Sequence, residues 1–334
     1  MRKSKFNWGR VFLISVVFII CLKLFNHGAS QKASLPVISG PDKVKPKGAI
    51  VVLAKGGNSK SYKELIFRNI GIRKYAWVAG LSDNIIFHEG NINKNHQSYI
   101  QSFTPDMPIK FINISSVFSE YYFVNKTECP SIGQGLKFSS GYRSMCYFWF
   151  ISFVDYLQEY DWMLRVDSDC ELKGNFDSVE AAACPFSSTL WIDLQNEKYD
   201  HVSEGKPDGD VVIGMKDLVT KVASKYHNLR TQIHTWKAPY SNVMYLSLKW
   251  LRSCEIVNEF IQEVKRSQCI YSNRWGDSPL WGAAVALAKL NEQLLPLPYY
   301  HGSHHVFVDR FGRTHQRSKR GTWSYWMQSM AFPD

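Results

Sequence analysis

The sequence predicts an α/β fold for the part of the chain that follows residue 47. A continuous apolar run from Ala49 to Ala54 leads into Gly56-Gly57, which is the pattern of a buried parallel strand entering a tight turn. Residues 61–75 then show apolar side chains at helical spacing, and two short apolar runs follow at 83–90 and 107–114. Strand, helix, strand, strand is the order of a nucleotide-binding α/β half.

The second half of the chain continues this alternation. Segment 141–160 is long, aromatic and free of proline, which favours a buried helix packed beneath the apolar strand that ends at Asp167. Further elements are expected as short strands within 179–195, a strand and helix in 209–226, an amphipathic helix at 250–268 and an alanine-rich buried helix at 277–290. With 45% hydrophobic residues, the 334-residue chain has ample material for a packed core.

The first 25 residues are typical of a membrane-targeting segment. A basic stretch precedes an apolar run, Val11 to Phe25, that only Ser15 and Lys23 interrupt, so the positive-inside bias keeps the N-terminus in the cytosol. We favour a signal anchor. A cleaved signal peptide stays an alternative, because the run is shorter than the ~20 residues that span a bilayer. The predicted organisation is a cytosolic tail (1–10), a membrane anchor (11–25), a stem (26–47) and a single luminal domain (48–334).

Two further features agree with the secretory pathway. Asn113 and Asn125 each begin a glycosylation sequon. Six cysteines follow the apolar run, an even number that favours disulfides in an oxidising compartment, although fifteen complete pairings are possible.

The net charge of +11 does not indicate a nucleic-acid partner. Six basic residues and no acidic residue lie in the first 32 positions, and removing those six charges leaves +5 for the remainder. That mild excess suits an anionic small substrate equally well.

An acidic motif follows the strand that segment 141–160 is expected to cover. Asp167 and Asp169, separated by one serine, can face one divalent cation, and Mg²⁺ or Mn²⁺ prefers such oxygen ligands while keeping positions open for phosphate. A metal that bridges a diphosphate stabilises the leaving group of a nucleotide sugar. A glycosidase pair fits less well, because its two carboxylates must lie on opposite sides of the scissile bond, about 5 Å or more apart.

Three blocks of the chain resemble the fungal α-1,2-mannosyltransferases of glycosyltransferase family 15. They are Gly141 to Phe150, the strand with the acidic motif, and Asn273 to Leu287, in the order in which the family has them; Val51 to Lys55 also resembles the family's first strand. The resemblance spans most of residues 48–305 but is dense only in these four patches. It implies a type II Golgi (or ER) enzyme with a single GT-A domain, in which helices flank a mixed central sheet.

The resemblance also implies an activity. This is retaining transfer of mannose from GDP-mannose to a glycan hydroxyl, with Mn²⁺ (or Mg²⁺) held by the acidic motif and a distant histidine. By position, Asp167 and Asp169 correspond to the acidic motif of the family, and Asp167 would also contact the donor. His301 is the best match to the family's histidine. His304 and His305 are close competitors.

The remaining candidate site residues come from these blocks or from the chemistry of their side chains. Tyr142, Arg143 and Lys55 would contact the nucleotide donor, since arginine suits phosphate. Asp277 would contact acceptor hydroxyls or assist proton transfer, with helix capping as the alternative. Trp275 and Tyr300 would stack on an acceptor sugar, with a place in the core as the alternative.

One departure from the family pattern affects the mechanism. The family has Ser-Asn-Phe-Glu where this chain has Ser241 to Met244, and a methionine cannot serve as a nucleophile. Attack on the front face, assisted by the departing diphosphate, would need no such side chain. Two alternatives therefore stay open: the same machinery with another nucleotide-sugar donor, or a catalytically silent luminal lectin or assembly subunit.

Overall fold

The computed structural model describes residues 46–57, 62–119, 138–193, 212–226 and 236–316. All of them belong to the second of two units into which the chain divides, residues 45–334. The predicted cytosolic tail, membrane anchor and most of the stem, and the sequon at Asn125, lie outside the described residues. Within the described ranges, no helix is both long enough and apolar enough to cross a bilayer.

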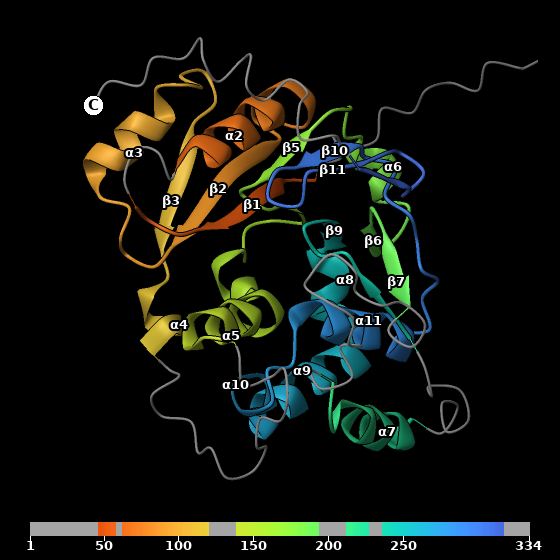
Figure 1. The fold of residues 1–334 in the computed structure, drawn as a ribbon. Coiled ribbons are helices and arrows are strands. Elements are labelled where there is room, and N and C mark those ends of the chain that lie inside the picture. Colours follow the sequence, from red (N-terminus) through yellow and green to blue (C-terminus); the bar gives the residue numbers. More distant parts are fainter. Residues whose placement is uncertain (1–45, 58–61, 120–137, 194–211, 227–235, 317–334) are drawn as a thin grey trace, which may run out of the picture. The chain divides into compact units, whose positions relative to one another are not determined.

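A six-stranded mixed sheet forms the centre of this unit, as expected (Figure 1). Its order is β3-β2-β1-β4-β9-β6; the first four strands are parallel, β9 runs antiparallel to β4, and β6 runs antiparallel to β9. The strands are β1 (Gly48–Ala54), β2 (Ser82–His88), β3 (Ile109–Asn113), β4 (Trp162–Val166), β6 (Phe186–Ser188) and β9 (Val243–Ser247).

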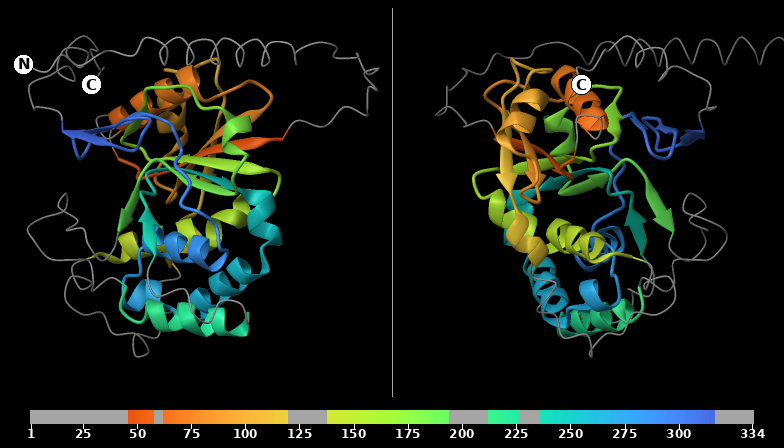
Figure 2. Two further views of the ribbon diagram at one scale, coloured as in Figure 1. Left: turned by 90° about the vertical axis from the view of Figure 1, so that its right-hand side faces the viewer. Right: turned by 60° about the vertical axis from the view of Figure 1, so that its left-hand side comes forward.

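Helices cover both faces of the sheet, because alternate residues of its buried strands point to opposite sides. Val51 packs into the cluster that contains Phe148 and Trp281, whereas Val52 packs against Leu65. Helices α2 (Lys63–Tyr75) and α3 (Lys94–Gln101) therefore lie on one face, and α5 (Ser140–Tyr147), α9 (Glu255–Ser267) and α11 (Asp277–Leu287) lie on the other (Figures 1 and 2). The shorter helices are α4 (Ser115–Ser119), α6 (Ser178–Ala181), α7 (Met215–Lys225), α8 (Leu248–Ser253) and α10 (Cys269–Ser272).

A smaller antiparallel sheet, of order β12-β11-β10-β5, lies beside α2 (Figure 1). It consists of β5 (Cys170–Leu172), β10 (Tyr299–His301), β11 (Val306–Val308) and β12 (Thr314–Gln316), while β7 (Trp191–Asp193) and β8 (Lys237–Pro239) form a separate pair. Since β5 begins directly after Asp169, its pairing with β10 brings the C-terminal part of the chain to the acidic motif.

The aromatic segment 141–160 is helical as expected, but it is not one α-helix. After α5 the chain forms a π-helix, η4 (Phe148–Ser152), and a 3₁₀-helix, η5 (Phe153–Tyr156). The carbonyl oxygen of Trp149 accepts a hydrogen bond from the indole N–H of Trp281 at 3.1 Å. Single π-helical turns inside longer helices often lie near functional sites.

The expected helix at 250–268 is two helices, α8 and α9, which meet at Cys254. The backbone of Cys254 is extended (φ −84°, ψ 95°). The Asn258 side chain donates hydrogen bonds to the carbonyl oxygens of Leu251 (3.0 Å) and Arg252 (3.2 Å), which satisfies the end of α8. The sequence contains no glycine or proline at this break, so no local pattern predicts it.

Four cysteines, Cys146, Cys170, Cys184 and Cys254, are free thiols, so these do not form the disulfides that the even cysteine count suggested. Cys146 and Cys170 are fully buried. Cys269, in contrast, is disulfide-bonded.

Candidate metal and nucleotide site

The acidic motif lies at the point where the strand order of the main sheet reverses, between β1 and β4. β1 pairs in parallel with β2 on one side and with β4 on the other. Ligands of open α/β sheets bind outside the carboxyl ends of the strands at such a point. β1 ends there in Lys55 and Gly56-Gly57, and β4 ends in Asp167, Ser168 and Asp169. The Gly56 N–H donates to Asn91 Oδ1 at 3.0 Å, which holds the turn after β1 close to the chain after β2.

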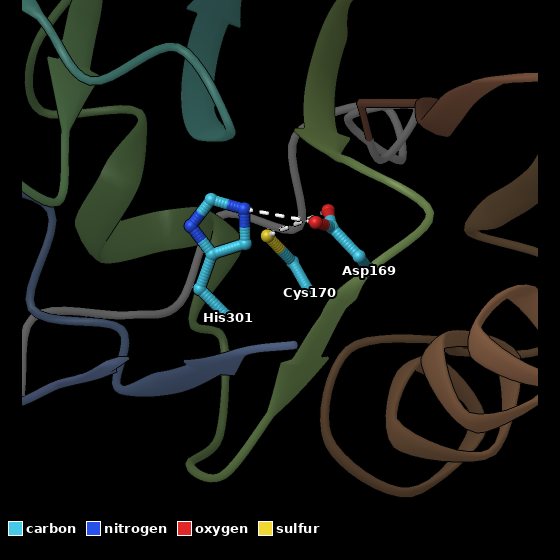
Figure 3. Close-up of side chains that lie close together, drawn as sticks. All are labelled: Asp169, Cys170 and His301. Atoms are coloured by element: carbon cyan, nitrogen blue, oxygen red, sulfur yellow. Dashed lines mark hydrogen bonds and ion pairs between the residues drawn. The ribbon is translucent and has the colours of Figure 1, made fainter. Parts of the chain in front are cut away.

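Asp169 and His301 come together through the pairing of β5 with β10. The register places His301 opposite Cys170, and the Gly302 N–H donates to the Asp169 carbonyl oxygen at 2.7 Å. As a result, His301 Nε2 lies 3.0 Å from Asp169 Oδ2 (Figure 3). The His301 side chain is only 3% exposed, so backbone and packing both fix its position.

Hydrogen bonds surround this pair on several sides. The Ser303 hydroxyl donates to Asp169 Oδ2 and lies 3.3 Å from His301 Nε2, while the Tyr240 hydroxyl lies 2.9 Å from His301 Nδ1. Burial alone would raise the pKa of Asp169, but the hydrogen bonds from His301 and Ser303 lower it to about 2. Asp169 is therefore a carboxylate at neutral pH.

The pair fits a divalent cation that prefers hard ligands. Carboxylate oxygen and imidazole nitrogen both suit Mn²⁺, and two adjacent ligand atoms of an octahedral cation, each about 2.1 Å from it, lie about 3 Å apart. Cys170 Sγ is close to both groups (Figure 3). Burial raises the pKa of Cys170 well above its ordinary value, and its sulfur is a softer ligand than Mn²⁺ or Mg²⁺ prefers.

Asp167, which we expected beside Asp169 as a second metal ligand, does not join this pair. Arg165 donates from Nε to Asp167 Oδ1 at 2.8 Å and from a terminal nitrogen to Oδ2 at 3.2 Å, and the Asn242 amide donates to Oδ2 at 3.1 Å. Alternate side chains of one extended segment share a face only while the strand continues, and the turn after Val166 ends that continuity. The structure thus gives the two carboxylates different partners.

Arg165 connects the acidic motif to the helix that carries Asp277. It is 4% exposed, and one terminal nitrogen donates to Asp277 Oδ2 at 2.6 Å. Its guanidinium carbon lies 4.3 Å from the centre of the Trp149 ring. Burial would lower the pKa of Arg165, but Asp167 and Asp277 together raise it, so Arg165 is a permanent cation. Asp277 lies in the first turn of α11 but makes no capping hydrogen bond; its side chain is 7% exposed and bonded to Arg165.

Two of the residues expected on the nucleotide side, Tyr142 and Arg143, form hydrogen bonds within the protein. Arg143 is buried and donates to the carbonyl oxygens of Tyr271 and Phe138. The Tyr142 hydroxyl accepts a hydrogen bond from Arg274 at 3.0 Å, and burial raises the pKa of Tyr142 well above its ordinary value. In this structure the Arg143 guanidinium and the Tyr142 hydroxyl are therefore both bonded to other parts of the protein.

The other predicted residues are placed as follows. Trp275 is 1% exposed and donates its indole N–H to the Ile213 carbonyl oxygen at 2.8 Å, and Tyr300 is 4% exposed with its hydroxyl 3.1 Å from His305 Nδ1. Both therefore lie in the core here, which is the alternative that the sequence left open for them. Lys55 is exposed at the end of β1, and Asn113 is exposed at the end of β3.

Met244 is fully buried in strand β9 and lies opposite Arg165 in the sheet register. The Met244 side chain cannot contact a bound sugar, because it belongs to the core beneath the sheet.

Among the solved structures with a similar architecture are fungal mannosyltransferases. Core-mannan synthase A of Aspergillus fumigatus, in a manganese and GDP form, has a TM-score of 0.51 and 14% identity, over 78% of this chain and 76% of that one. The mannosyltransferase Ktr4p of S. cerevisiae has a TM-score of 0.50 and 16% identity in complex with GDP, and 0.52 and 15% in another structure, in both cases over 90% of this chain and 82% of that one.

This chain shares their fold. At these identities the likeness concerns the fold alone, which is the glycosyltransferase fold that the motif resemblance implied. No protein-family model matches the chain, and no curated protein sequence matches it.

Sequence reasoning missed two residues that organise the site. Arg165 gave a usable signal, because a charged residue inside a buried apolar strand must be paired. Tyr240 gave none, since a tyrosine between a proline and a serine can occupy many environments.

Proposed function

We propose that this chain is a metal-dependent glycosyltransferase that moves a hexose from a nucleotide sugar to a glycan hydroxyl with retention. The family resemblance favours GDP-mannose as the donor and mannose as the transferred sugar. The observation that carries the proposal is the Asp169–His301 pair, with Nε2 and Oδ2 3.0 Å apart at the carboxyl end of β4. Two of the structures that share the fold contain GDP, one of them with manganese.

In this proposal Asp169 and His301 hold Mn²⁺, or Mg²⁺. When bound, the cation neutralises charge on the diphosphate of the donor and on the leaving nucleotide. Asp169 supplies a carboxylate that is ionised at neutral pH, and His301 supplies an imidazole nitrogen. Lys55 and the Gly56-Gly57 turn lie at the adjoining end of β1, where an exposed ammonium and close backbone approach suit a phosphate.

Arg165 and Asp277 have a supporting role in this proposal. Arg165 holds Asp167 and Asp277 in one buried network, so it fixes the turn from which Asp169 projects. Since the Met244 side chain belongs to the core, we infer that retention proceeds by front-face attack, with the departing diphosphate assisting the acceptor hydroxyl.

A second candidate is a catalytically silent lectin or assembly subunit that keeps the fold. Two observations favour it: the position of the family's glutamate is a buried methionine, and the Asp277 carboxylate is bonded to Arg165. Such a subunit would bind sugar without releasing nucleotide.

The cellular setting of the proposal rests on the sequence. We place the catalytic domain in the lumen of the Golgi, or of the ER, behind a single-pass anchor at residues 11–25, and expect glycans at Asn113 and Asn125. The partners are then a nucleotide sugar, a glycan acceptor and the membrane.

The deciding experiment uses the full chain purified from a secretory host. It is incubated with Mn²⁺, a simple mannoside acceptor and each common nucleotide sugar in turn, and nucleotide release and labelled product are measured. Asp169→Ala removes the carboxylate of the pair, and Asp155→Asn, an exposed carboxylate on η5, is the control.

We expect product from GDP-mannose with the wild type and the control, and none with Asp169→Ala. Product from another donor would retain the enzyme class and replace mannose. A folded protein that binds Mn²⁺ and nucleotide but shows no turnover with any donor would support the silent subunit.

A further inference from the structure

Tyr240 lies against the side of the His301 ring that faces away from Asp169. Its hydroxyl is 2.9 Å from Nδ1, and the two rings meet at 67° with centres 5.8 Å apart. The separation of the hydroxyl from Nδ1 is that of a hydrogen bond.

The backbone of Tyr240 is held independently of His301. Its N–H donates to the Leu190 carbonyl oxygen at 2.8 Å, and its carbonyl oxygen accepts from the Ser188 hydroxyl at 3.1 Å. Tyr240 follows β8, whereas His301 ends β10, so two separate elements of the fold position the two partners. The contact is thus built into the architecture.

The role of this contact depends on which ring nitrogen of His301 carries the proton. A neutral imidazole carries one proton, and a nitrogen that binds a cation must offer its lone pair. With Nε2 on the metal, the proton lies on Nδ1 and needs an acceptor. The His301 side chain is 3% exposed, so water has little access to it, and the Tyr240 oxygen is in place to accept.

In the other neutral tautomer the hydrogen bonds run in the opposite direction. Nε2 carries the proton and donates it to Asp169, and Nδ1 accepts from the Tyr240 hydroxyl. A hydroxyl can donate or accept by rotating, so one side chain serves both states.

We propose that Tyr240 is a positioning residue that holds the His301 ring through Nδ1 and accepts the Nδ1 proton when Nε2 binds the cation. This inference rests on the proposed metal site. Partners that hold a ligating histidine through its second nitrogen typically contribute 10- to 100-fold in metal affinity. Phenylalanine at this position keeps the ring and removes only the hydroxyl, so Nδ1–H would lose its acceptor.

The test measures Mn²⁺ binding by the full chain, from the electron paramagnetic resonance signal of free Mn²⁺. We expect Tyr240→Phe to raise the dissociation constant about 10-fold or more. Tyr99→Phe is the matched control, because the Tyr99 hydroxyl is buried with no hydrogen-bond partner in the described part of the chain; its affinity should equal that of the wild type.

A double-mutant cycle with His301→Ala separates positioning from general damage. If Tyr240 acts through His301, the Tyr240→Phe change has no further effect on Mn²⁺ binding once His301 is absent. A merely structural role would weaken binding in both backgrounds. Thermal unfolding of each variant without metal shows that the folded state is compared in every case.

Wild-type affinity in Tyr240→Phe would overturn this inference and leave the proposed function standing. Absence of Mn²⁺ binding by the wild type would overturn both the metal site and the role of Tyr240. Mn²⁺ binding that depends on Tyr240, in a protein without transferase activity, would support the inference and contradict the proposed enzyme.

Discussion

At the scale of single residues, Arg165 shows how one cation determines the roles of the carboxylates around it. Its guanidinium contacts Asp167 and Asp277 and lies over Trp149, and these bonds leave Asp169 to pair with His301. A buried charge is tolerated only when it is paired, so Arg165 and its two carboxylates form one unit.

Replacing Arg165 with methionine should therefore destabilise the protein strongly. Two carboxylates would remain largely buried without their cation, and breaking such a buried pair costs about 3–5 kcal/mol. Urea unfolding with linear extrapolation measures the free energy of unfolding. Arg73→Met, which breaks an ion pair with both side chains about half exposed, should change it little. Equal effects of the two variants would contradict this account of Arg165.

At the scale of elements, β5 and β10 build the candidate site, although each is only three residues long. Neither strand carries a pattern that identifies its partner, yet their register sets His301 opposite Cys170 and beside Asp169. Helix α11 has a comparable role on the other side, because its first turn holds Asp277 against Arg165.

Close packing of α11 on β8 should make Gly282 sensitive to substitution. A Cβ at Gly282 would overlap the Lys237 carbonyl oxygen and lie 2.9 Å from the Trp236 ring. Gly282→Ala should therefore cost about 1–3 kcal/mol in the free energy of unfolding, as overpacked sites do. Gly141→Ala in α5 is the control, since the nearest atom there lies 4.0 Å away and alanine favours helix. An unchanged free energy of unfolding in Gly282→Ala would mean that α11 and β8 can move apart without cost.

The strands of the main sheet are also joined by an ion network at their amino-terminal side. Asp83 in β2 contacts Lys110 in β3 at 2.8 Å and Lys47, just before β1, at 3.3 Å, and it accepts from the Tyr160 hydroxyl at 2.7 Å. Burial alone would raise the pKa of Asp83, but the hydrogen bonds from Lys110 and Tyr160 outweigh it and lower the pKa.

Asp83 should therefore stabilise the protein in a pH-dependent manner. Its pKa is lower in the folded than in the unfolded chain, so the stabilisation is fully present above the unfolded value of about 4 and is lost as pH falls through the folded value. The difference in urea midpoint between wild type and Asp83→Asn should be constant from pH 5 to 8 and shrink below pH 4. A difference that grows in acid would reverse the sign of this argument.

At the scale of the whole molecule, a bound cation should stabilise the entire fold. The Asp169–His301 pair forms only when β5, β10 and β4 are assembled, so the unfolded chain lacks the site. Mn²⁺ at 100 times its dissociation constant should then raise the free energy of unfolding by about 2.7 kcal/mol. Thermal unfolding with and without Mn²⁺ measures this, and Asp169→Asn should abolish the increase. An increase that persists in Asp169→Asn would place the cation elsewhere.

The sequence by itself determined the α/β class, the first strand, helix α2, the strand before the acidic motif and the buried helix α11. These depend on local patterns, namely apolar runs, helical spacing and helix-start residues, that a short window of sequence contains. The motif resemblance added the glycosyltransferase fold and the choice of Asp169 and His301.

Tertiary structure alone decided which carboxylate meets which partner. Asp167 and Asp169 look equivalent in sequence, but Arg165 and Asn242 bond to one while His301 and Ser303 bond to the other. The contacts of His301 with Asp169 and with Tyr240 join residues more than sixty positions apart. Such contacts follow from strand register and packing, which depend on the whole chain and which no local pattern records.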